Sequence, residues 1–120
     1  MQIQIRQDMP ESGFLDIGCL LEKAVAGSGV ACGVCVIRAV EPGVGLLHGP
    51  RDAQAGQDLW DDYARLFDGA FGPYVKAAVG GQALELIILD GRPLLGPAET
   101  VYAAGYGGGK SAKFSVGCFG

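Results

Sequence analysis

Four cysteines and one histidine are the residues of this 120-residue chain whose types suit redox, metal or acid–base chemistry. Cys32 and Cys35 have the spacing of a redox pair or of half a zinc site. A redox pair of that kind opens a helix, whereas this one leads into an apolar segment typical of a strand. Cys19, Cys118 and His48 lack the spacing of a second pair of zinc ligands. We therefore expect reduced, buried, weakly polar thiols, with a metal-binding or redox module as the alternative.

The segment Gly105–Ser111 (GYGGGKS) is similar to the end of a phosphate-binding loop. Such a loop needs a glycine where Ala104 stands, and a helix after Ser111 whose amides face the phosphate. The residues after Ser111 read as a strand instead. A glycine-rich turn is therefore expected, with an anion-binding nest formed by glycine amides and Lys110 as the alternative.

Two further groups of polar residues carry less specific signals. His48 has the side chain of a general base, but no nucleophile stands at a recognisable spacing from it. We expect a surface or half-buried histidine at a strand end. The acidic residues Asp58, Asp61 and Asp62 predict a solvated helix face, with a cation site as the alternative.

The elements that position these residues follow from the hydrophobic periodicity. Asp16 is predicted to cap a helix that runs to about Ala26, a second helix is predicted over Asp52–Phe67, and a short helical turn at Tyr74–Val79. The Asp90-Gly91 pair between apolar runs predicts a tight hairpin. Strands are predicted over Gln2–Gln7, Gly33–Val40, Val44–His48, Ala83–Leu89, Arg92–Leu95, Glu99–Tyr106 and Ala112–Phe119. The order β-α-β-β-α-β-β-β-β predicts one α+β domain over residues 1–120, whose final third is an antiparallel meander.

Composition narrows the classes of partner. The formal net charge of −4 argues against nonspecific nucleic-acid binding, which requires a basic surface. No apolar run approaches the roughly 20 residues that span a bilayer, so no membrane segment is expected. The polar first ten residues do not resemble a signal peptide. We expect a cytoplasmic protein.

Short motifs in a fixed order extend along nearly the whole chain. Gly13–Ile17 and Ser28–Val30 are similar to "GFxDI" and "SGI", and Gly33–Cys35 to "G.C". Tyr74–Gly80 is similar to "HIKAALLG", and Asp90–Gly96 to "DGRLxLG". Together these motifs resemble the YjbQ family, to which a secondary thiamine-phosphate synthase activity is assigned.

The resemblance implies a β-rich α+β fold, a sheet or half-barrel or a sandwich with two main helices. It also implies a homotrimer with a polar pocket for an anion or metal near the subunit boundary. No cofactor follows from it for this chain.

The chain departs from the family at its functional motifs. Glu41 stands at or near the histidine of "PHTTA", Tyr74 replaces the histidine before "IKA", and Gly96–Thr100 replaces "GTWQG". The loop that holds a further family histidine is shortened to Asp68–Pro73. Neither Glu41 nor Tyr74 supplies both a neutral-pH base and a metal ligand.

These departures predict a catalytically degenerate YjbQ-like protein that binds a small anionic or phosphate ligand or has a structural role. The alternative is an enzyme with a rebuilt site, whose side chains would converge on one pocket. The candidate catalytic positions are Glu41, Tyr74 and Glu99, and the candidate ligand-binding residues are His48, Asp52, Lys76 and Arg92.

Overall fold

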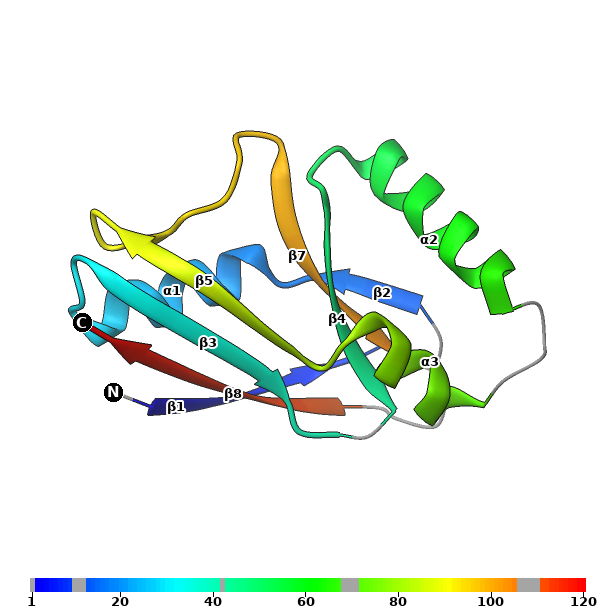
Figure 1. Cartoon of the computed structure of the whole chain (residues 1–120), viewed down its shortest axis with the longest axis horizontal. Coiled ribbons are helices and arrows are strands. Elements are labelled where there is room, and N and C mark those ends of the chain that lie inside the picture. The colour runs from blue at the N-terminus through cyan, green and yellow to red at the C-terminus, as the bar shows by residue number, and fades with distance from the viewer. Residues whose placement is uncertain (1, 10–12, 42, 68–71, 106–110) are drawn as a thin grey trace.

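A computed structural model describes residues 2–9, 13–41, 43–67, 72–105 and 111–120 of the chain (Figure 1). It contains three helices and eight strands within these residues. In chain order they are β1 (Gln2–Asp8), β2 (Gly13–Asp16), α1 (Gly18–Ser28), β3 (Gly33–Ala39), β4 (Val44–Pro50), α2 (Ala53–Phe67), α3 (Pro73–Gly80), β5 (Ala83–Leu89), β6 (Arg92–Pro93), β7 (Glu99–Gly105) and β8 (Ser111–Phe119). None of these helices is long and apolar enough to cross a membrane.

The strands form two antiparallel sheets. One has five strands in the order β1-β8-β3-β5-β6, and the other has three in the order β2-β7-β4. On β3, Cys35, Ile37 and Ala39 are buried, while the intervening residues are more exposed, as the alternation of a half-buried strand requires. The buried face of the five-stranded sheet packs with α1 and the three-stranded sheet into one core. The predicted α+β fold class is confirmed, with a curled five-stranded sheet as its half-barrel.

The start of α1 is tied to β7 by two hydrogen bonds to one carboxylate oxygen. Oδ1 of Asp16 accepts the backbone N–H of Gly18 at 2.8 Å and the hydroxyl of Thr100 at 2.6 Å. Thr100 is the one polar residue that is fully buried among those described. The helix runs two residues later than the predicted Asp16–Ala26, and it ends at Gly29, which has a φ of 74°.

Helix α2 docks on the three-stranded sheet through aromatic side chains. The ring of Phe14 on β2 stacks on Trp60 and meets Tyr102 of β7 edge-on. Gly56 lets the helix approach closely, because a Cβ there would lie 2.5 Å from the Tyr102 hydroxyl. The helix therefore has the amphipathic character predicted for residues 52–67, and its aromatic face is packed against the sheet.

The Asp90-Gly91 hairpin is confirmed. Both residues have positive φ, 53° and 74°, and Leu89 pairs with Arg92 across the turn. This is the backbone geometry that a two-residue hairpin needs, and it explains an Asp-Gly pair at this position.

The helical segment predicted at Tyr74–Val79 is confirmed as α3, which is one residue longer at each end, and α1 and α2 are the two main helices. Strand pairing departs from the prediction in two places. The final third is not a meander, since β7 lies in the second sheet while β8 pairs with β1 and β3. Gly13–Asp16 forms a strand that pairs with β7, where the sequence predicts none. Pairing between distant strands is decided by tertiary packing, which local periodicity does not report.

We predict that Thr100→Val lowers the free energy of unfolding by about 1–2 kcal/mol, because a buried hydrogen bond to a carboxylate is lost without a change of shape. Urea denaturation followed by circular dichroism measures this loss. Asp16→Ala should also destabilise, and the two losses should be less than additive because the residues share one bond. A wild-type free energy of unfolding in Thr100→Val would show that the hydrogen bond between Thr100 and Asp16 does not stabilise the protein.

Candidate functional site

The paired ends of β4 and β7 bring two predicted site residues into contact. His48 lies opposite Val101, and Pro50 lies opposite Glu99. Nδ1 of His48 is 3.7 Å from Oε2 of Glu99, and both side chains are about 40% exposed. The other carboxylate oxygen of Glu99 accepts the backbone N–H of Gly96 at 3.2 Å. The imidazole therefore has a fixed carboxylate at one nitrogen.

Two residues after β4 belong to the same corner. Arg51 donates a side-chain hydrogen bond to the backbone carbonyl of Glu99 at 3.3 Å. Asp52 accepts the backbone N–H of Ala55 at 2.9 Å and so caps the start of α2. The Arg51 guanidinium therefore lies beside the His48–Glu99 pair, and Asp52 follows Arg51 in the chain. A cation beside such a pair suits acid–base chemistry or the binding of a small polar ligand.

Tyr102 connects this corner to the core. Its hydroxyl donates to the backbone carbonyl of Pro50 at 2.6 Å. Burial raises the pKa of Tyr102, and the carboxylates of Asp16 and Asp52 raise it further. The phenol is therefore held protonated, and in this state it can donate the bond that fixes the end of β4.

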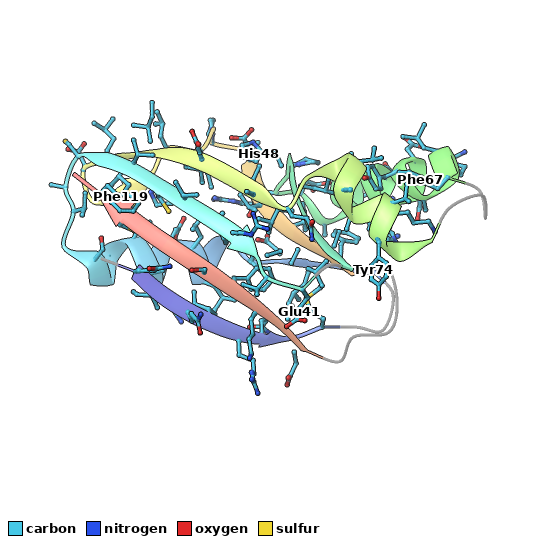
Figure 2. The ribbon with its side chains drawn as sticks, turned by 60° about the horizontal axis from the view of Figure 1, so that its bottom comes forward. Glu41, His48, Phe67, Tyr74 and Phe119 are labelled. Atoms are coloured by element: carbon cyan, nitrogen blue, oxygen red, sulfur yellow. The ribbon has the colours of Figure 1, made fainter. Side chains whose placement is uncertain are left out.

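The other predicted residues lie elsewhere in the chain. Glu41 precedes β4, and Tyr74, which is two-thirds exposed, lies on α3. Figure 2 shows His48 on the side of the molecule away from Glu41 and Tyr74. The four residue steps from Val44 to His48 along β4 alone span about 13 Å.

Lys76 and Arg92 are also separate from the corner. Lys76 is half-buried on α3, and its backbone carbonyl accepts the hydroxyl of Tyr63. Arg92 is exposed on β6, at one edge of the five-stranded sheet. A single chain therefore brings His48 and Glu99 together, places Asp52 at the start of α2, and does not gather all seven residues in one pocket.

An apolar crevice lies between α2 and the three-stranded sheet. None of the seven predicted residues lines it, and its walls are aromatic or aliphatic apart from one glycine. They are formed by Phe14, Leu47, Gly56, Leu59, Trp60 and Tyr102. The crevice therefore belongs to the docking of α2.

The cysteines do not form a CxxC site. Cys35 and Cys118 are buried opposite each other on β3 and β8, which confirms the apolar interpretation for this pair. Cys32 and Cys19 are exposed, so the expectation of burial is wrong for them. Cys32 lies just before β3 and Cys35 within it, and only the latter faces the core. Among the described residues, no group of three or more metal-ligating side chains lies together.

Of the remaining sequence motifs, the structure describes the acidic residues of α2 but not the glycine-rich segment. Asp58, Asp61 and Asp62 are exposed on α2, which confirms the solvated helix face. The anion nest and its Lys110 fall on residues 106–110, outside the described part of the chain. Most of the shortened loop at Asp68–Pro73 also falls outside it.

The sequence does not point to Arg51, to Thr100 or to the second hydrogen bond of Asp16. Arg51 follows a predicted strand and precedes a predicted helix cap, a position where polar residues from two elements meet. Asp16 was interpreted as a cap for its own helix, and it does accept a bond from that helix's first residue. Its second bond, to Thr100, joins residues 84 positions apart, and nothing local in the sequence indicates it.

We predict that the free energy of unfolding falls as the pH rises from about 9 to about 12. Burial, and then the adjacent Cys118 thiol, raise the pKa of Cys35 from 9.0 to about 12. In that window the unfolded chain loses the Cys35 proton while the folded chain keeps it, so the stabilisation present below pH 9 is lost.

Urea denaturation across this pH range provides the measurement. Cys35→Ala should show a shallower loss than wild type, and Cys32→Ala, an exposed control, should follow wild type. Parallel curves for wild type and Cys35→Ala would contradict the prediction.

Comparisons with known proteins identify solved structures that have the same fold. No family model and no curated protein matches the chain. A solved structure from Clostridium acetobutylicum is 24% identical, with a TM-score of 0.88 and 99% of each chain covered. A YbjQ-like protein of unknown function from Sulfolobus solfataricus is 14% identical, with a TM-score of 0.90, covering 100% of this chain and 96% of that one.

A third structure carries the family name itself. It is an uncharacterised conserved protein of the YjbQ family from Clostridium acetobutylicum, 23% identical, with a TM-score of 0.86, covering 98% of this chain and 99% of that one. Full-length coverage at these TM-scores means that the same elements occur in the same arrangement. The chain therefore has the YjbQ-like fold that its motifs predict.

Proposed function

We propose that this chain is a cytoplasmic YjbQ-like homotrimer that binds a small anionic ligand or has a structural role, and that it does not catalyse thiamine-phosphate synthesis. The observation that supports the proposal is that Glu41 and Tyr74 stand where the family motifs have histidines, with no other histidine beside them in the chain. The only histidine of the chain pairs with Glu99, whereas Glu41 and Tyr74 lie on another side of the same chain (Figure 2).

The chemistry at these positions agrees with the proposal. An imidazole exchanges protons near pH 7 and also ligates metals, which a glutamate carboxylate and a phenol cannot both do there. The Tyr74 side chain is largely exposed, so its surroundings give it no specific partner among the described residues. What remains is the scaffold with polar side chains at its surface, which suits binding more than catalysis.

The His48–Glu99 contact favours a second candidate, an enzyme with a rebuilt site. A carboxylate at Nδ1 orients an imidazole and leaves Nε2 to exchange a proton with a substrate. Arg51 lies beside the pair and could bind an anionic substrate group. In this candidate the acid–base residue is His48, and Glu41 and Tyr74 have no role.

We predict that purified protein forms thiamine phosphate no faster than its Glu41→Ala and His48→Ala variants. Product formation from the two phosphorylated precursors of thiamine phosphate, followed by chromatography, measures these rates. A wild-type rate well above Glu41→Ala would contradict the loss of the family reaction. A rate that falls only in His48→Ala would replace the leading proposal with the rebuilt enzyme.

A further inference from the structure

Helix α3 exposes an apolar face to solvent. Its sequence, PYVKAAVG, has one charged residue, Lys76, and that side chain is half-buried. Ala77 is buried on the side that packs against β4. The opposite side presents Tyr74, Val75, Ala78 and Val79, which we call the helix patch. A helix that is apolar all round is normally covered on every side, and no described residue covers this one.

The five-stranded sheet has a second uncovered apolar surface on its outer face. Val34 of β3 is paired with Phe119 of β8 on one side and with Ile87 of β5 on the other. The N–H of Leu94 bonds to the carbonyl of Ile87 and extends the same row. These four residues, the sheet patch, are between 41% and 60% exposed. Phe119 lies over Gly117, which leaves its ring on the surface.

The two patches lie toward opposite ends of an elongated molecule that measures 43 × 26 × 21 Å. Figure 1 shows α3 and the C-terminal end of β8 well apart along the long axis, and Figure 2 shows the same separation for Tyr74 and Phe119. One chain therefore cannot cover its own sheet patch with its own helix patch.

We propose that the helix patch of one copy of this chain docks on the sheet patch of the next copy, in a head-to-tail ring. An unpartnered helix face and an unpartnered sheet face are the two surfaces that pack together within α+β domains. Because the two patches differ, the contact is heterologous, and it closes into a ring when the rotation between copies allows. This inference rests on the proposed homo-oligomer and specifies its interface.

The size of the two surfaces fits contact between copies. One helix patch and one sheet patch together remove on the order of 700 Å² of apolar surface from water, since each residue is roughly half-exposed. Interfaces are about 56–58% apolar, so the whole contact would bury about 1,200 Å², the lower end of the range for stable complexes. A different protein docked at one patch would leave the other patch exposed. Contact between two copies covers the helix patch of one and the sheet patch of the other.

The charges near the patches are complementary. Lys76 is on α3, and Glu85 stands two residues from Ile87 on the same face of β5. Docking α3 over the sheet patch brings these opposite charges to one interface, where they favour the correct orientation. Arg92, which pairs with Leu89, lies at the edge of the same sheet.

The test uses one lysine substitution in each patch, Ile87→Lys and Val79→Lys, with Gln4→Lys as the matched control. Gln4 is exposed on β1, opposite Ser115, on the same outer face but away from the patch. Light scattering after size-exclusion chromatography should give a multiple of 12.4 kDa for wild type and for Gln4→Lys. Each patch variant should give about one chain mass while keeping a wild-type circular dichroism spectrum.

Mixing the two variants tests the head-to-tail arrangement. Ile87→Lys keeps its helix patch and Val79→Lys keeps its sheet patch, so an equimolar mixture should form a species of two chains and no ring. A wild type that is monomeric at every concentration overturns both this inference and the proposed homo-oligomer. A wild-type oligomer that both variants preserve overturns only the interface, as does a mixture that stays monomeric.

Discussion

The backbone of β7 is enclosed from Thr100 to Gly105, so its peptide groups must be paired inside the protein. β2 pairs with one edge of this strand and β4 with the other. The position of each neighbour follows from this pairing. The register of β4 places His48 beside Glu99, and the hydroxyl of Thr100 binds Asp16 at the start of α1. The arrangement of the candidate site therefore follows from the hydrogen-bond partners that the buried strand β7 requires at its two edges.

Some residues of this fold are required by the backbone geometry, and others are not. Asp90 and Gly91 adopt positive φ, and few other residue pairs would fit that turn. Glu41 and Tyr74 have no such constraint, because the described contacts of Glu41 use its backbone carbonyl and Tyr74 points to solvent. The fold therefore does not depend on which side chains stand at positions 41 and 74.

The local elements were predictable, because residue periodicity and turn chemistry determine them. Ala83–Leu89 was predicted exactly, and the helix at residues 53–67 within one residue. The pairing of strands could not be predicted in this way, because the pairing of β8 with β1 and β3 depends on contacts between residues far apart in the chain. The same limit applied to the site. His48 and Glu99 are 51 positions apart, and their contact follows from the register of β4 against β7 and from no local pattern.

A crystal structure of the assembled protein would show whether this chain uses the YjbQ-like scaffold for association and binding without the family chemistry. We expect α3 of one copy to cover Val34 and Ile87 of the next, while His48 stays paired with Glu99 in its own chain. A structure in which both patches face solvent would contradict this expectation, as would one in which Glu41, Tyr74 and His48 gather around one bound thiamine phosphate.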